Sequence, residues 1–309
     1  MKVDFTDIEL NSSLSIAESS DVVQTSDLID RVAKRRTELD QGIRLPWPKI
    51  ADAVKLRAGE MILMGGYSGH FKSTLASQMG LCALQQGYKV GIASLELVAE
   101  DTVEHYAEIA AASTKGRPPI DWVRRFATYA QDKLFFYDRV DAIEPDIAIQ
   151  MVLALILHKG CKLIVLDALM MMGVCDDLER ERRFCQTLQA IVKKHKVTVL
   201  LIHHMRKPGQ GGEAVVPGKY DFIGSSHIAN MSPSIFICWH DKRQNSLKQM
   251  VEMGAQVDDF DPDKRDMLFS VVKQRNGKFE GQFSLWSATG NRGFSENPRR
   301  RLAPLELPR

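Results

Sequence analysis

The stretch over residues 61–76 constrains the fold most, because it joins an apolar run to a helical pattern through a glycine-containing loop. Met61–Met64 predicts a buried strand, and Lys72-Ser73-Thr74 opens the helix. Strand, glycine loop, Lys-Ser and helix together form the design of a phosphate-binding P-loop, in which backbone N–H groups and the helix dipole attract phosphate. Lys72 would reach the β- and γ-phosphates, and the Ser73 hydroxyl would hold Mg²⁺.

One position departs from this motif, because the pattern has Gly before the Lys and this chain has Phe71. A Phe keeps its N–H but adds bulk and resists positive φ, so we expect Gly69 to take over the sharp turn. From the motif alone, an ordinary glycine turn into a helix remains the alternative. The predicted nucleotide-binding residues are Gly66, Tyr67, Ser68, Gly69, His70, Phe71, Lys72, Ser73 and Thr74.

The composition is that of an ordinary globular protein, with 44% hydrophobic and 26% charged residues among 309, enough for one large domain or two small ones. A net charge of +2 implies that any nucleic-acid binding uses local loops. The five cysteines have no CxxC spacing, which indicates reduced thiols in a cytosolic protein and no zinc knuckle. We expect no signal peptide and no membrane span.

Two further apolar runs end in carboxylates. The run over Lys89–Leu97 predicts a strand that delivers Glu96 to the sheet edge, where it could act as a general base or simply mark the strand's exit to solvent. Lys162–Asp167 predicts a parallel strand buried on both faces. Asp167 would then lie at its carboxyl end, where α/β sheets place ligands, and would orient a Mg²⁺-bound water.

A histidine pair ends the next predicted strand. His203 and His204 follow Val197–Ile202 and could contact a γ-phosphate, whereas a shared metal ion is disfavoured because adjacent strand side chains point to opposite faces. Residues 206–222 then form a long Gly-rich loop that suits tracking a phosphate backbone, with a disordered surface loop as the alternative. Its cations are Arg206, Lys207 and Lys219.

The remaining pattern alternates strands and helices, which predicts an α/β fold with a mostly parallel central sheet flanked by helices. Further helices are expected over 27–39, 100–131 (two, split by 116–119), 145–158 and 178–195, and further strands over 134–137, 234–239, 268–273 and 282–286.

We divide the chain into an N-terminal arm with a linker helix (1–44), a main domain (45–295) and a basic, Pro-rich tail (296–309) expected to be disordered. The charged residues 241–266 are expected to project from the domain.

Over about residues 40–290 the chain resembles the C-terminal motor domain of the DnaB-type hexameric replicative helicases, a group that includes phage primase-helicases, Twinkle and plasmid RepA helicases. Ser94-Leu95-Glu96 is similar to the family segment whose Glu activates the attacking water, and Leu163–Asp167 to its second Walker motif. His204 falls where the family carries a γ-phosphate sensor. The most specific match is Lys273-Gln274-Arg275-Asn276-Gly277, whose Lys and Arg would reach the neighbouring subunit's site as a piston and an arginine finger.

The resemblance implies a RecA-like P-loop NTPase core in a ring-shaped, ATP-dependent DNA helicase. Such a protein would act on single-stranded DNA in replication of a phage, plasmid or satellite element, in the host cytoplasm. It would use ATP or another NTP with Mg²⁺ and form a homo-oligomer, a hexamer in the family, with a helicase loader, primase or origin-binding protein as further partners. The implied catalytic residues are Lys72, Glu96, Asp167, His204, Lys273 and Arg275, with Ser73 and Asp167 as metal ligands and Arg206, Lys207 and Lys219 on DNA.

Two other functions remain open. A RecA/KaiC-like ATPase that binds DNA without unwinding it would share every residue of the nucleotide site. A catalytically weak helicase-like protein that recruits or caps another replication protein is favoured by Phe71.

Overall fold

The computed structural model describes residues 23–40, 42–175, 177–209, 212–224, 226–258 and 260–307. The chain divides into two compact units at the boundary between residues 41 and 42. In the first unit a 3-10 turn, η2 (Ser26–Leu28), leads into helix α2 (Ile29–Asp40), close to the helix predicted over 27–39. Most of the predicted arm before it, residues 1–22, lies outside the described residues.

The second unit is built on a sheet of nine strands in the described residues, in the order β11-β10-β9-β8-β3-β7-β6-β4-β5, with β1 and β2 as a separate pair. The strands are β1 (Ile43–Arg44), β2 (Lys55–Leu56), β3 (Met61–Gly66), β4 (Val90–Ser94), β5 (Leu134–Phe136), β6 (Leu163–Asp167), β7 (Thr198–His204), β8 (Ser234–His240), β9 (Met267–Gln274), β10 (Gly281–Ser287) and β11 (Phe294–Ser295).

Six neighbouring strands, from β5 to β8, run parallel, and β9 to β11 complete the sheet in antiparallel fashion. The predicted mostly parallel sheet is therefore confirmed. Strand β3 lies inside the parallel part, where Gly66 is level with His204 of β7. Ser94 of β4 is level with Asp167 of β6. The strands β3, β4, β6 and β7, which lead to the predicted phosphate-site residues, thus end at one common edge.

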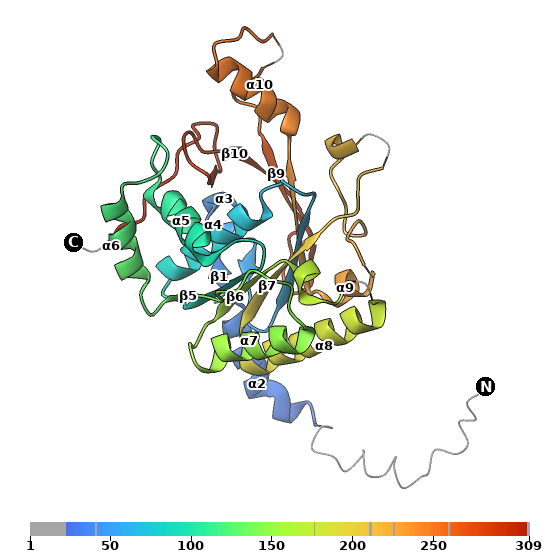
Figure 1. Ribbon diagram of the computed structural model, residues 1–309. Helices are drawn as coiled ribbons and strands as arrows, with labels where there is room; N and C mark the ends of the chain where they lie inside the picture. The colour runs from blue at the N-terminus through green and yellow to red at the C-terminus, as the bar shows by residue number, and fades with distance from the viewer. Residues whose placement is uncertain are drawn as a thin grey trace. The chain divides into compact units, whose positions relative to one another are not determined.

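Helices cover both faces of this sheet (Figure 1). In β3, Ile62 and Met64 belong to the core shared with α4 to α6, whereas Met61 and Leu63 belong to the core shared with α7 and α8. This alternation follows from the two-residue period of a strand, and burial on both faces explains the continuous apolar run. The helices are α3 (Pro48–Ala51), α4 (Lys72–Gln85), α5 (Ala99–Ala111), α6 (Ile120–Ala130), α7 (Pro145–Leu157), α8 (Leu178–His195), α9 (Ser226–Met231) and α10 (Lys242–Glu252), with 3-10 turns η3 (Leu169–Met172) and η4 (Gly212–Ala214).

The C-terminal segment differs from the prediction of a disordered tail. Arg300 is buried and its guanidinium pairs with the buried Asp266 carboxylate, and the Leu305 amide donates to the Ala110 carbonyl at 2.7 Å. These partners lie far away in the sequence, so the Pro- and Arg-rich composition gave no sign of them. Within the charged segment 241–266, Lys242–Glu252 forms α10, which projects from the sheet as expected (Figure 1). Among the described residues, no helix combines the length and apolar character needed to cross a bilayer.

Phe71 caps the N-terminus of α4 in the left-handed conformation, with φ 57° and ψ 28°. Gly69 also has a positive φ of 75°, so it does not relieve Phe71 of the turn as the sequence suggested. The Phe71 ring packs edge-on against His240 and Phe294, with centroid distances of 4.8 and 5.4 Å. The loop therefore keeps the backbone shape that favours glycine, and ring contacts offset part of the strain.

The pair Phe71→Gly and Phe71→Ala isolates this backbone requirement, because both variants lose the ring and only alanine keeps a Cβ. We expect the Gly variant to unfold at higher denaturant, with a free energy of unfolding about 1 kcal/mol above that of the Ala variant. Equal stabilities, measured by chemical denaturation, would show that the left-handed conformation is not required at this position.

Candidate functional site

The P-loop places its lysine inside the protein. The Lys72 side chain is buried, and its ammonium donates to the carbonyls of Gly66 and Tyr67 at 3.1 and 3.0 Å. Burial lowers the Lys72 pKa, while the charges of Asp167 and Glu96 act in the opposite direction. A cation held between the loop and two carboxylates is placed to meet a phosphate that enters the loop.

Ser73 and Asp167 meet next to this lysine, because β6 ends beside the first turn of α4. The Ser73 hydroxyl donates to the Asp167 carboxylate in a short hydrogen bond. Burial raises the Asp167 pKa, and the Glu96 charge adds to this, whereas the Ser73 hydrogen bond lowers it. A buried carboxylate and a hydroxyl are hard oxygen donors of the kind Mg²⁺ prefers, and a divalent cation would favour the ionised carboxylate. These residues therefore fit the predicted magnesium site.

Glu96 and His204 meet across the same edge. Strand β4 ends at Ser94, two residues before Glu96, so Glu96 stands in the loop beyond the strand rather than within it. His204 Nε2 lies 3.3 Å from Glu96 Oε1, and this hydrogen bond is the main cause of the lowered Glu96 pKa. A carboxylate that stays ionised, half exposed beside a buried lysine, can accept a proton from a bound water.

His203 points to the other face, as the strand period predicts. Its side chain is fully buried, and burial lowers its pKa to about 4, so the ring is neutral. His203 Nε2 lies 2.8 Å from the Ile223 carbonyl. Of the two histidines, only His204 therefore reaches the phosphate-binding edge.

A contact that the sequence did not reveal joins the P-loop to the loop 206–222. The His240 amide donates to His70 Nδ1 at 3.0 Å, which leaves His70 Nε2 as the ring's N–H, 3.5 Å from Glu213 Oε2. Glu213 also pairs with Lys242 of α10 at 2.5 Å. Because His70 and Glu213 are far apart in the sequence, no local pattern could have paired them.

The cations of the loop 206–222 are exposed, as a nucleic-acid surface requires. Arg206, Lys207 and Lys219 all have exposed side chains. The base of the loop is closed by a bridge between Met205 and Phe222. Burial is the largest cause of the lowered Lys273 pKa. The charges of Arg275 and then of Lys219 lower it further, so Lys219 lies close to Lys273. The base of the loop is therefore fixed, and the cations Arg206, Lys207 and Lys219 are exposed.

The hairpin between β9 and β10 holds Arg275 away from the phosphate site of its own chain. Ile62 of β3 is level with Ser234 of β8, which is level with Gln274. Arg275 thus lies level with the start of β3, whereas the P-loop follows its end, about 16 Å away along the strand. Lys273 donates to the carbonyls of Ala229 and Asn230 at 2.8 and 2.9 Å.

The structure brings together the predicted residues Lys72, Ser73, Glu96, Asp167 and His204, and leaves Lys273 and Arg275 apart from them.

Comparisons with known proteins show which proteins this chain is similar to. A DNA helicase/primase of Enterobacteria phage T3 is 25% identical over 217 residues, which cover 63% of this chain and 38% of that protein, so the chain spans well under half of this relative. One solved structure of an ATPase domain has a TM-score of 0.69 at 12% identity, over 89% of this chain and 99% of that one.

A second solved structure, of a DnaB-like replicative helicase and its interactions with primase, has a TM-score of 0.70 at 13% identity, over 92% of this chain and 71% of that one. The fold is thus that of DnaB-like helicase ATPase domains, and the resemblance seen in the sequence is confirmed. A family model described as AAA domain matches residues 31–210, more than half of the chain. The chain therefore belongs to the AAA domain family.

Proposed function

We propose that this chain is an NTP-hydrolysing motor that assembles into a ring, moves along single-stranded DNA and unwinds duplex DNA during replication of a phage, plasmid or satellite element. The observation that supports it best is the convergence of a buried lysine, a hydroxyl, two carboxylates and a histidine at one edge of a parallel sheet. The likeness to a phage helicase/primase and to DnaB-like ATPase domains supports the same class of function.

In this proposal the P-loop amides and Lys72 bind the phosphates of ATP or another NTP, and Ser73 and Asp167 hold Mg²⁺. Bound Mg²⁺ neutralises charge on the β- and γ-phosphate oxygens. Glu96 takes a proton from the attacking water. His204 orients Glu96 by their 3.3 Å contact and would sense whether a γ-phosphate is present.

Arg275 supplies the charge that the site of a single chain lacks. The backbone around Arg275 is held on both sides: the Gln274 side chain binds Arg57 and the Phe279 carbonyl, and the Asn276 amide binds the Glu60 carboxylate at 2.8 Å. The Arg275 side chain itself is exposed. A guanidinium on a rigid turn can insert into the site of an adjoining copy, and a head-to-tail interface of this kind closes into a ring.

Arg275→Ala should lower NTP hydrolysis by about 10³-fold or more, because an arginine finger acts on the transition state. Nucleotide affinity should stay close to that of the unsubstituted protein, since Lys72 and the loop amides are intact. Lys278→Ala is the matched control, as it removes an exposed cation from the same turn. Steady-state turnover and a nucleotide-binding titration separate the two effects, and an unchanged turnover in Arg275→Ala would refute the role in trans.

The contact of His70 with Glu213 offers a route from the nucleotide to DNA. Glu213 lies in η4, inside the loop that we propose to contact DNA, and its carboxylate also binds Lys242. A phosphate in the P-loop would compete with the Glu213 carboxylate for nearby positive charge. Nucleotide binding and release would therefore bias the position of the loop 206–222.

Glu213→Gln removes the ion pair with Lys242 while keeping the side chain's size. We expect hydrolysis without DNA to change less than about twofold, and stimulation by single-stranded DNA to fall severalfold, because the loop loses its charged link to the P-loop. Glu100→Gln, at an exposed carboxylate that begins α5, is the control. Equal DNA stimulation in both variants would argue against this coupling.

A strand-displacement assay on a forked DNA duplex tests the function as a whole. With ATP and Mg²⁺ the protein should separate the strands, and Lys72→Ala should not. DNA-stimulated hydrolysis without strand separation would instead indicate the RecA/KaiC-like ATPase. An absence of turnover with single-stranded DNA present would indicate the non-enzymatic recruiting or capping protein.

A further inference from the structure

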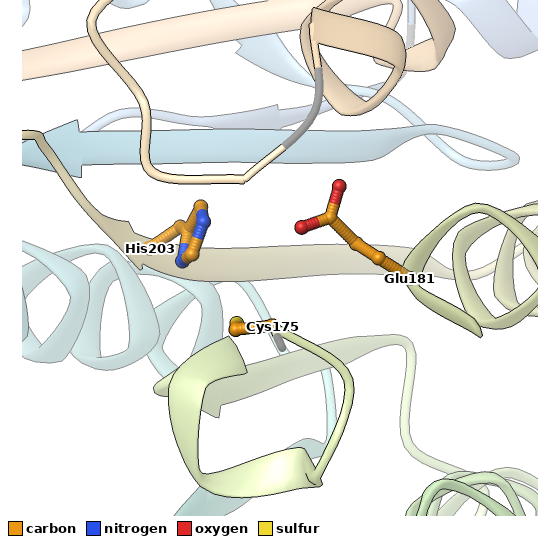
Figure 2. Close-up of side chains that lie close together, drawn as sticks. All are labelled: Cys175, Glu181 and His203. Atoms are coloured by element: carbon orange, nitrogen blue, oxygen red, sulfur yellow. The ribbon is translucent and has the colours of Figure 1, made fainter. Parts of the chain in front are cut away.

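Three side chains of metal-binding chemistry meet behind the nucleotide site, on the opposite side of β7 from His204. They are Cys175, Glu181 and His203, and one potential ligand atom of each lies within 4.8 Å of the others. Figure 2 shows them converging from three elements: the loop after η3, the first turns of α8, and the end of β7. Neither the nucleotide site nor the proposed DNA surface uses these groups.

His203 is oriented as a metal ligand would be. Its Nε2 lies 2.8 Å from the Ile223 carbonyl, which only accepts hydrogen bonds, so Nε2 carries the proton and Nδ1 presents a lone pair. The ring also stacks on Phe222, with a centroid distance of 6.1 Å and an interplanar angle of 9°. His203 Nδ1 is buried and has no hydrogen-bond partner among the described residues. A backbone carbonyl that fixes the tautomer while the other nitrogen points inward is the usual arrangement around a metal-bound histidine.

The place of Glu181 is equally specific. Its side chain is fully buried, and a carboxylate oxygen lies within 4.8 Å of the ligand atoms of Cys175 and His203. Gly224, at φ +85°, passes so close that a Cβ at this position would overlap the Glu181 carboxylate. The backbone therefore forms a tight cradle for the acid, and only glycine leaves room for it.

We propose that Cys175 Sγ, the Glu181 carboxylate and His203 Nδ1 bind one Zn²⁺ ion. Sulfur, nitrogen and oxygen donors in one set suit this ion. Binding releases the Cys175 thiol proton to solvent, and the two anionic ligands then balance the charge of the ion. Ligand atoms in a tetrahedral zinc site lie about 3.3–3.8 Å apart, so these groups, which lie within 4.8 Å of one another, need to close by at most about 1.5 Å, and water completes the fourth position.

The ion would act as a structural clamp. His203 is adjacent to His204, and Cys175 lies in the loop that follows Asp167 and η3. One ion would thus tie the β6–α8 loop to the strand that carries the proposed γ-phosphate sensor. This role depends on the proposed motor, but the binding of the ion does not.

Metal content tests the site directly on the full chain. After the reduced protein is incubated with Zn²⁺ and desalted, elemental analysis should give one zinc per chain, and Co²⁺ in its place should give the thiolate-to-cobalt absorption band. Cys175→Ser and His203→Gln should bind at least tenfold less metal and lack the band. Cys82→Ser, at a half-buried thiol that contacts the Arg44 carbonyl, should behave like the unsubstituted protein.

An unsubstituted protein that retains no zinc, or variants that bind as much as Cys82→Ser, would overturn the proposal. A second measurement guards against variants that fail to fold: Zn²⁺ should raise the thermal midpoint of the EDTA-treated, unsubstituted chain, since a ligand of the folded state stabilises it. An unchanged midpoint would also refute the site. None of these readouts requires hydrolysis or unwinding, so failure here is distinct from failure of the motor.

Discussion

The structure depends on the common carboxyl edge of β3, β7, β6 and β4, where a buried ammonium faces buried and half-buried carboxylates. Lys72 is buried next to Asp167, and each group shifts the other's pKa toward the charged form, against the effect of burial. Such a cluster needs strands that end in register, because a displacement of one residue would turn each side chain to the other face. The parallel pairing of Gly66 with His204 and of Ser94 with Asp167 provides that register.

The P-loop shows how a departure from a motif can keep the motif's geometry. Phe71 adopts a backbone conformation that costs most side chains about 1–2 kcal/mol. Its ring packs against His240, whose amide in turn binds His70. The same elements thus support the shape of the loop and link it to Glu213. This arrangement weighs against the idea that Phe71 alone marks a decayed site.

Much of the fold could be predicted, because an apolar run that ends in a polar residue indicates a strand that is buried on both faces. Asp167 and His204 were found in this way, since each ends such a run. Features that depend on contacts between residues far apart in the sequence could not be predicted, because no local sequence pattern indicates which distant residues will meet. The Arg300–Asp266 pair fixes a tail that composition alone suggested was disordered, and the cluster around His203 forms only once α8 packs beside β7. The roles of Arg275 and Lys273 remain predictions, since both concern a second copy of the chain.

In the proposed ring, the phosphate site of one subunit is completed by the next. The most direct test is a structure of the full chain assembled on single-stranded DNA with Mg²⁺ and a non-hydrolysable ATP analogue. We expect Arg275 of the partner subunit to lie about 3 Å from the γ-phosphate that Lys72 contacts. An Arg275 side chain that faced solvent at every subunit interface would refute the shared phosphate site.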